Sequence, residues 1–500
     1  MALHLRRRSF LALAAGSSAG VAATAFLARR ALTRSGMSAF AAAGSRLRSG
    51  GGRLELDLVA QETAVAIPGG PARALTYNGQ LPGPQLEAEP GDAVRIRLHN
   101  RLDRPTNLHY HGLHIPPDGN ADNVFLSVPP GASQEYSFTI PADHPAGIFY
   151  YHPHRHGTVA DQVFGGLGGV LIVRGALDRI PELRAAREQV LFLKDLPGGD
   201  GVSPMGRGMG MGMMLGREGE VLTVNGTVNP RLPIPAGGLL RLRIVNGSNA
   251  RFWRLAMDDH PFHLIATDGG ALAAPVELRE LLLAPGERAD VLVRGDRSPG
   301  RYRLLNLPYG RATGGRMGGM GMGMGPMGRG MRRGRRGGRF PAAAGAVPIA
   351  TLSYEGAVAT LPLPSQLLPV EPLPAPVRTR RFVLNHGMAP GMGMVFLING
   401  RPYGHERIDT RVRLGDTEEW ELVNAGVMDH PFHVHINPFQ VISRDGSPAP
   451  FRAWKDVVLV RAGETVRIRI RFADFAGRTV YHCHILDHEE LGMMGVLEIA

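Results

Sequence analysis

Short runs that alternate apolar and polar residues dominate the chain from about residue 50 onward, and Gly (67) and Pro (39) interrupt them frequently. In RAGETVRIRIRF, which starts at Arg461, every second residue from Val466 onward is apolar. Such alternation puts the apolar side chains on one face of an extended strand, whereas patterns typical of long helices are scarce. The chain is therefore predicted to be all-β and to form sandwich domains.

The order of these elements repeats along the chain. PPGASQEYSFTI from Pro129, APGERADVLVRG from Ala284 and RAGETVRIRIRF from Arg461 each join a turn to an alternating strand, and a second related stretch follows each of them. This repetition predicts three copies of one β-domain, for which 500 residues are sufficient. We expect these domains at residues 50–176, 177–360 and 377–500, with a Pro-rich linker at 361–376.

Residues 1–45 are predicted to be an export signal and a linker. Arg6 to Arg8 precede SFL from Ser9 and a stretch of small apolar residues that continues to about Leu27. The RRSFL core resembles the twin-arginine type of signal, which predicts a periplasmic or secreted protein. An uncleaved membrane anchor is the alternative, although the Ala, Gly and Ser content favours removal. No other segment is apolar enough to span a bilayer, so we expect no stable membrane embedding.

The formal charge of +12 comes almost entirely from arginine, because Lys194 and Lys455 are the two lysines of the chain. The arginines are scattered through predicted strands and loops, and no basic stretch is interleaved with aromatic residues. The charge therefore does not indicate a nucleic-acid partner. We expect small-molecule partners and a monomer.

Two segments rich in Gly, Met and Arg, residues 205–214 and 316–339, interrupt the strand pattern. Segments of this composition form neither a packed core nor a regular strand, so both are predicted to be loops.

Cys483 is the one cysteine of the chain, so no internal disulfide can form even though the protein is predicted to be exported. An inert buried thiol is the ordinary interpretation of such a residue. Its flanking histidines, in HCHILDH from His482, favour a chemical role instead.

Most of the 19 histidines fall into four clusters: HYHG (109–112), HPHRHG (152–157), HPFHVH (430–435) and HCHILDH (482–488). Alternate residues of a strand share a face, so His109 and His111 point together, as do His152 and His154. Each pair can bind a metal.

The same geometry within HCH sends His482 and His484 to one face of a strand and Cys483 to the other. One strand therefore serves two metal sites. A thiolate, two imidazoles and a distant thioether are the ligands of a mononuclear electron-transfer copper, and Cys483, His430, His488 and Met493 supply them. The other clustered histidines suit a three-copper cluster; they are His109, His111, His152, His154, His433, His435, His482 and His484.

These four clusters resemble the four copper motifs of the multicopper oxidases, a family that includes laccases and bacterial cuprous oxidases. The resemblance covers the chain from about residue 50 to its end, and HCHILDHEELGMM is its most specific part. It implies three consecutive cupredoxin-like Greek-key β-sandwich domains and four copper ions. The implied ligands are His430, Cys483, His488 and Met493 for type 1 copper, His109 and His433 for type 2, and His111, His152, His154, His435, His482 and His484 for the type 3 pair.

Zinc is an alternative metal for His and Cys ligands, but zinc does no redox chemistry and would not need so many histidines. Asp122 in GNADNVF and Glu489 directly after His488 resemble the carboxylates that relay protons to reduced oxygen in this family. A turn-forming or solvated carboxylate is the alternative for each.

Other histidines are predicted to have ordinary roles. VNGSNARFWRLAMDDHPFHL and VNAGVMDHPFHVH are similar, which aligns His260 and His263 with His430 and His433, but Ile265 replaces the third histidine. We therefore interpret His260 and His263 as structural. His114 and His156 extend the ligand clusters and are candidates to line the copper cavity. Ordinary surface or core positions are predicted for His4, His99, His144, His386 and His405.

The family resemblance implies an oxidase that couples one-electron oxidation of a substrate to four-electron reduction of O2 to water. Copper(I) is the favoured substrate, with phenols and aromatic amines as further ones, because thioethers suit copper(I) and the Met-rich segments resemble insertions of periplasmic cuprous oxidases. Candidate substrate-copper ligands are Met428, Met317, Met320, Met322 and Met324, but Gly426 stands where an acidic companion is expected. Three alternatives stay open: compositional drift in the Met-rich segments, a laccase acting mainly on phenols, and a non-enzymatic cell-envelope scaffold.

Overall fold

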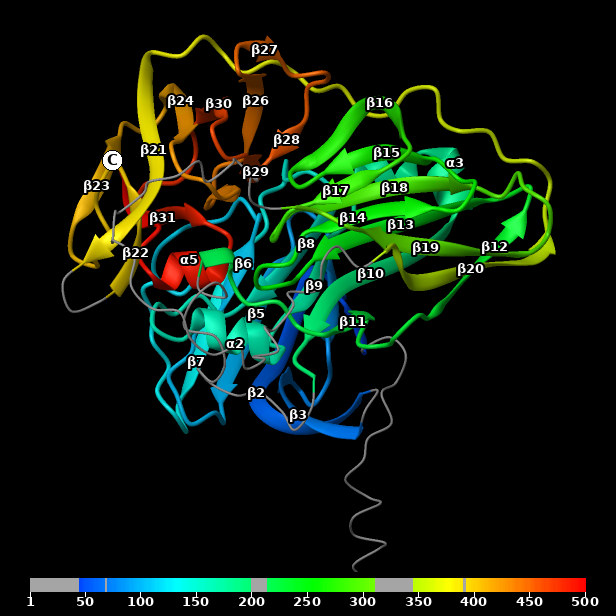
Figure 1. Cartoon of the computed structure of the whole chain (residues 1–500), viewed down its shortest axis with the longest axis horizontal. Helices are drawn as coiled ribbons and strands as arrows, with labels where there is room; N and C mark the ends of the chain where they lie inside the picture. The colour runs from blue at the N-terminus through cyan, green and yellow to red at the C-terminus, as the bar shows by residue number, and fades with distance from the viewer. Residues whose placement is uncertain (1–44, 68–69, 199–213, 311–344, 390–392) are drawn as a thin grey trace, which may run out of the picture.

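The computed structural model describes residues 45–67, 70–198, 214–310, 345–389 and 393–500. Its strands form six sheets, which follow one another along the chain as three pairs (Figure 1). The all-β prediction is confirmed. The predicted export signal and most of the Met-rich segments, including Met317, Met320, Met322 and Met324, lie outside the described residues.

The first pair of sheets has the strand orders β3-β2-β5-β7 and β1-β4-β9-β8-β6. Its strands are β1 (Arg46–Arg48), β2 (Arg53–Ile67), β3 (Gly70–Tyr77), β4 (Gly83–Ala88), β5 (Ala93–Asn100), β6 (His109–His111), β7 (Ser133–Thr139), β8 (Gly147–His152) and β9 (Gly169–Val173). Helix α2 (Val159–Gly165) follows β8, and η1 (Ala176–Arg179) and α3 (Pro181–Ala185) lead to the next pair.

The second pair has the orders β11-β10-β13-β18-β15-β16 and β12-β20-β19-β14-β17. Its strands are β10 (Arg187–Leu196), β11 (Val221–Val224), β12 (Arg231–Ala236), β13 (Leu239–Asn246), β14 (Trp253–Met257), β15 (Phe262–Thr267), β16 (Gly270–Leu278), β17 (Leu281–Leu283), β18 (Arg288–Arg294), β19 (Arg301–Leu307) and β20 (Val347–Ala357).

The third pair has the orders β22-β21-β24-β30-β26-β27, with β28 beside β26, and β23-β32-β31-β25-β29. Its strands are β21 (Arg378–Ala389), β22 (Gly393–Ile398), β23 (Ile408–Val412), β24 (Thr417–Asn424), β25 (His430–Val434), β26 (Phe439–Arg444), β27 (Ser447–Pro448), β28 (Trp454–Lys455), β29 (Val457–Val460), β30 (Thr465–Arg471), β31 (Gly477–Cys483) and β32 (Met494–Ile499). Helix α5 (Leu486–Glu490) lies between β31 and β32.

Strand pairing confirms the internal repeat. In each pair of sheets a first strand runs parallel to a second, which is antiparallel to the strand predicted from the repeated turn: β2, β5 and β7, then β10, β13 and β18, then β21, β24 and β30. The alternation in these strands has the expected origin, because β5 and β30 alternate exposed or half-buried and buried residues. Their buried sides contribute to one apolar core in each pair, around Tyr136, Trp253 and Trp420.

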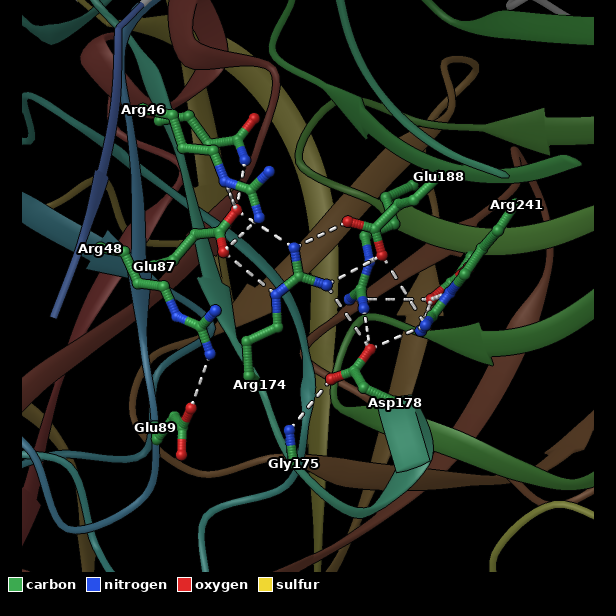
Figure 2. A network of polar contacts seen from close by, with 12 residues as sticks. Arg46, Arg48, Glu87, Glu89, Arg174, Gly175, Asp178, Glu188 and Arg241 are labelled. Atoms are coloured by element: carbon green, nitrogen blue, oxygen red, sulfur yellow. Dashed lines mark hydrogen bonds and ion pairs between the residues drawn. The ribbon is translucent and has the colours of Figure 1, made fainter. Parts of the chain in front are cut away.

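A partly buried ion-pair network joins the first two pairs of sheets (Figure 2). Arg174, just after β9, binds Glu87 of β4 and Glu188 of β10. Glu188 also accepts a hydrogen bond from Arg243 of β13, and Arg243 pairs with Asp178 of η1. Separating these residues would leave buried charges without partners, which is costly. The network therefore holds the first and second pairs of sheets, below called the first and second units, in one relative position.

The first and third pairs of sheets also meet, since α2 packs beside α5 through Val159, Val163 and Leu486 (Figure 1). Residues 361–376 contain no helix or strand, and Leu361, Leu363 and Leu367 pack against the second pair of sheets. The domain boundaries given above stay predictions. Within the described ranges, no helix is both long and apolar enough to cross a membrane.

Candidate metal centres

Three predicted type 1 ligands meet in the core of the third pair of sheets. Cys483 Sγ lies 3.5 Å from His430 Nδ1 and 3.6 Å from His488 Nδ1, and the two nitrogens are 3.3 Å apart. The centre of such a triangle is about 2 Å from each corner, close to ordinary metal–nitrogen and metal–sulfur distances. All three residues are buried, so these donors fit a metal ion.

The backbone fixes this triangle. β25 supplies His430 and β31 supplies Cys483, while the turn through α5 returns His488 to the same place. Cys483 N–H donates to Met493 O at 3.0 Å, and Met493 N–H donates to His488 O at 2.9 Å. Met493 is buried in the same apolar core as Cys483. The loop therefore holds Cys483, His488 and Met493 together, and β25 places His430 beside them.

Burial controls the protonation of these donors. It raises the pKa of the Cys483 thiol above its usual value, so a thiolate here needs a nearby cation. Burial, and to a smaller extent the neighbouring His386, lowers the pKa of His430 to about 3, so this imidazole stays neutral. A neutral imidazole can bind metal.

Met214, the last residue of the first Met-rich segment, covers His488: His488 Nε2 donates a hydrogen bond to Met214 O at 2.9 Å. A face of the His488 ring stacks on Phe396, with the ring centroids 3.9 Å apart. The imidazole is fully buried.

The eight other predicted ligands converge between the first and third pairs of sheets. Ring nitrogens lie within 4.8 Å of one another in the groups His109, His111 and His152; His109, His433 and His435; and His154, His435 and His482. His482 Nε2 is 3.0 Å from His154 Nε2 and 3.1 Å from His435 Nε2. His484 Nε2 is 2.9 Å from the Tyr150 hydroxyl, and its ring lies 4.8 Å from that of His111. All eight are buried.

The hydrogen bonds of these rings favour metal binding. The Nδ1 atoms of His109, His152 and His433 face Asp122, the Pro153 carbonyl and the Asp456 carbonyl at 2.8 to 3.0 Å. Their Nε2 atoms are buried and find no hydrogen-bond partner among the described residues. A ring fixed on one nitrogen with the other free is the arrangement of a metal-binding histidine. Burial lowers the pKa of His152 to about 3 and that of His482 to about 4, which keeps both neutral.

Strand pairing relates the two halves of this cluster. β6 pairs with β8 through His109 and His152, and β25 pairs with β31 through His433 and His482, at the same place in the repeat. By this register the equivalent pairs are His109 and His433, His111 and His435, His152 and His482, and His154 and His484. Two copies of one four-histidine arrangement therefore face each other.

The second pair of sheets lacks this arrangement. Its equivalent strands are β14 and β19, and their register places Ala256, Asp258, Leu305 and Leu307 at the four histidine positions, with Asn306 in place of Cys483. Trp253 is opposite Leu283 as His430 is opposite Val460, so Trp253 occupies the position of His430.

The alignment of His260 and His263 with His430 and His433 is therefore wrong. His263 lies in β15, which pairs with β18. In the third unit the equivalent of β18 is β30, and the corresponding strand paired with β30 there is β26, not β25. The match of the four residues HPFH produced the wrong alignment, because so short a match carries no information on which sheet the strand belongs to. His260 donates to or accepts from the Tyr354 hydroxyl at 2.9 Å, which agrees with a structural role.

Asp122 and Glu489 both contact predicted ligands. Asp122 Oδ1 lies 2.9 Å from His109 Nδ1 and also accepts the Tyr110 N–H, and burial raises the pKa of Asp122 to about 8. Glu489 is fully buried, with its Oε2 atom 3.3 Å from His482 Nδ1 and its Oε1 atom 3.8 Å from His154 Nδ1. Burial raises the pKa of Glu489 well above its usual value, so both groups are able to hold a proton near neutral pH.

Two residues at the cluster, Asp456 and Arg288, are not predicted by any pattern in the sequence. Asp456 Oδ1 lies 3.0 Å from His111 Nε2, while its backbone carbonyl faces His433. Arg288 of β18 binds both carboxylate oxygens at 2.6 Å and also donates to Ile148 O, so it contacts all three units. Neither residue lies in a histidine motif, and only the fold brings them to the cluster.

Three other residues predicted near the metal sites, Met428, His156 and His114, take different positions. Met428 is buried in the third core, with the predicted type 1 residues. His156 lines a cavity of about 360 Å³ together with the predicted ligand His154 and with Tyr403, and its place in the copper cavity stays a prediction. His114 instead binds Ile436 O and Asp474.

Comparisons with known proteins agree with this geometry. Family models, each described as multicopper oxidase, match residues 59–177, 204–318 and 374–500. The multicopper oxidase mco of Staphylococcus epidermidis is 30% identical over 438 residues, covering 86% of this chain and 84% of the relative. The cell division protein FtsP of Dickeya dadantii is 30% identical over 438 residues, covering 84% of each chain.

Among solved structures, a multicopper oxidase from Campylobacter jejuni, described as a metallo-oxidase, has a TM-score of 0.75 and 29% identity. The match covers 91% of this chain and 95% of that chain. The three family matches, the shared sequence and the common architecture confirm the cupredoxin-like β-sandwich fold. The chain belongs to the multicopper oxidase family and is a copper-dependent oxidase.

Proposed function

We propose that this oxidase couples the oxidation of copper(I) to the reduction of dioxygen: four copper(I) ions and four protons react with one O2 to give four copper(II) ions and two water molecules. Phenols and aromatic amines are proposed as further substrates. His430, Cys483, His488 and Met493 would hold type 1 copper, and His109 and His433 type 2 copper. The type 3 pair would be held by His111, His152, His154, His435, His482 and His484.

The observation that carries the proposal is the position of Cys483 between His482 and His484. Cys483 belongs to the three-donor triangle of the third unit, whereas both neighbours belong to the eight-histidine cluster. Covalent bonds of three consecutive residues therefore connect the two donor sets. Copper bound in both would supply one-electron transfer and the reduction of dioxygen.

Residues around the cluster have separable tasks. Glu489, fully buried beside His154 and His482, is positioned to hold a proton next to the cluster. Asp122 orients His109 through its Nδ1 atom and can also hold a proton. Asp456 and Arg288 fix His111 and His433. We expect Glu489→Gln and Asp122→Asn to slow oxygen uptake by about 10-fold or more, while substrate still bleaches the blue thiolate–copper absorption.

Copper(I) is preferred as substrate because of the methionines in residues 205–214 and 316–339. Met214 contacts His488, which supports a role for the first of these segments near the predicted type 1 site. The similarity to the C. jejuni multicopper oxidase, which is described as a metallo-oxidase, supports a metal ion as the substrate proposed here. We further propose that residues 1–45 export the protein to the periplasm, where copper(I) oxidation would serve copper homeostasis.

Deletion of residues 316–339 tests the substrate. The deletion should lower copper(I) turnover at low concentration while turnover of a bulky phenol holds or rises, and copper content serves as the control. Unchanged copper(I) turnover in a fully loaded deletion variant would favour a laccase. The similarity to FtsP raises the scaffold alternative, but the complete set of metal donors opposes it. Absence of oxygen uptake by copper-loaded protein with every substrate would support the scaffold.

A further inference from the structure

One face of the β21–β22 hairpin carries soft metal donors. In the antiparallel register, His386 lies opposite Phe396, and Met388 lies opposite Met394. Directly opposed residues, and residues two apart on one strand, point to the same face of a sheet. An imidazole, two thioethers and an aromatic ring therefore share this face.

The inner end of the hairpin face contacts the predicted type 1 site. Phe396 is buried and stacks on the His488 ring, with an angle of 16° between the planes. The ring of His386 is 6.3 Å from that of Phe396. Met394 packs against the apolar core that includes Cys483 and Met493. Side chains of this face therefore form a continuous path to His488.

The outer end of the face reaches solvent. Met388 is 76% exposed, and Val427, in the segment that continues β24 alongside β21, is 51% exposed. A methionine with most of its surface in water gains little from packing, whereas its thioether is available to a ligand. A small ion can thus reach the hairpin face from outside.

His386 has a donor atom without a partner. Its Nδ1 atom is buried and makes no hydrogen bond to any described residue, which is unfavourable for a polar atom. Gly426 lies beside it, and a Cβ atom at position 426 would be 3.6 Å from Nδ1. Because residue 426 is a glycine, it places no side chain against Nδ1. The ordinary role predicted for His386 from the sequence does not account for this.

Imidazole and thioether ligands select monovalent copper over hard cations, which prefer oxygen. We propose that His386, Met388 and Met394 form a docking site for substrate copper(I), from which the electron leaves through Phe396 toward His488. The inference rests on the proposed copper(I) oxidase function. One bound copper(I) gives up one electron and departs as copper(II), and four such electrons complete the dioxygen reaction given above.

Silver(I) binding to the copper-loaded full chain tests this site, because silver(I) has the charge and softness of copper(I) but is not oxidised. We compare the parent with the triple variant His386→Leu, Met388→Leu, Met394→Leu, and with His99→Leu as a control in the first pair of sheets. The same titration in a chain lacking 316–339 removes competing methionines. The triple variant should bind silver(I) about tenfold more weakly or lose one site, with unchanged copper content.

Kinetics separate this inference from the proposed function. The triple variant should raise the KM for copper(I) about fivefold or more, whereas kcat for a phenol should stay within about twofold of the parent value. Unchanged silver(I) binding and unchanged copper(I) KM would overturn the hairpin site. If the parent oxidises phenols but not copper(I), the proposed copper(I) oxidase function is wrong. Silver(I) binding then still tests whether the hairpin face binds a soft monovalent ion.

Discussion

The second and third pairs of sheets have the same strand pairing but carry different residues at the positions of the predicted metal ligands. Where β25 and β31 present His430, His433, Cys483 and His482, the equivalent positions of β14 and β19 present Trp253, Ala256, Asn306 and Leu305. Trp253 fills the core and donates its indole N–H to Ser248, and the Asn306 side chain accepts the Arg254 N–H. The fold provides positions for donors, and the residues at these positions decide whether a unit binds metal.

The same contrast holds for buried charges. In the second unit, Arg241 pairs with Asp290 away from any histidine of the cluster, and both are buried. At the cluster, Arg288 pairs with Asp456, which also contacts His111. The second unit therefore supplies no predicted ligand but still contributes to the cluster. Its Arg288 orients the Asp456 carboxylate, which in turn orients the predicted ligand His111.

The largest expected effect is that of Cys483→Ser, compared with Asn306→Ser at the equivalent position. Removing the thiolate should abolish the blue absorption and lower oxidase activity by more than about 100-fold, because changes one step further from a metal already cost 10–100-fold. Asn306→Ser should keep both properties. Visible absorption and oxygen uptake give the comparison, and an active Cys483→Ser protein would disprove the assignment.

Asp456→Asn and Asp290→Asn separate positioning from stability. Each leaves a buried arginine without its full partner, so each should lower the free energy of unfolding by about 3–5 kcal/mol. Asp456→Asn should in addition lower oxygen uptake by about 10–100-fold, because His111 loses its orientation. Chemical denaturation and oxygen uptake are measured on both. Equal activity in the two folded variants would contradict the positioning role of Asp456.

Acidification of the copper-free protein should affect the units differently. Burial lowers the pKa of His152 to about 3 and of His482 to about 4, so below about pH 6.5 the unfolded chain binds protons that the folded chain does not. Stability is complete above pH 6.5 and falls by about 1.4 kcal/mol per pH unit for each such histidine as the pH drops toward these values.

Hydrogen exchange, corrected for its intrinsic pH dependence, measures this loss. Between pH 7 and 5.5, protection in β8 and β31 should decrease, whereas β19, with Leu305 at the equivalent position, should keep its protection. At pH 7, added copper should raise the protection of β8 and β31 above that of the copper-free protein. A uniform loss across all three strands would show that the buried histidines do not determine the response.

The smallest effect is expected from His260→Asn. His260 forms hydrogen bonds with Tyr354 and the Asp258 carbonyl, so the change should cost about 1 kcal/mol of stability. Copper content and oxygen uptake should match the parent. Loss of copper from this variant would show that the second unit contributes a ligand.

Local periodicity in the sequence was sufficient for the main elements. Alternation predicted the strands, and the two-residue spacing in HYH and HCH predicted which histidines share a face, because a strand has a fixed period. The alignment of His260 failed because HPFH does not specify which neighbour a strand pairs with. Asp456, Arg288 and the cover of His488 by Met214 depend on contacts between distant segments, which no local pattern encodes.

The central claim is that equivalent histidines of the first and third units share one copper cluster, separate from the site of Cys483. Copper per chain, measured by mass spectrometry of the metal content in the parent and in His109→Ala, His152→Ala, tests it most directly. The account predicts four copper ions in the parent and one in the double variant, which keeps its blue absorption because His430, Cys483 and His488 are untouched. Retention of the cluster's copper after loss of both first-unit histidines, or loss of the blue absorption with it, would contradict the account.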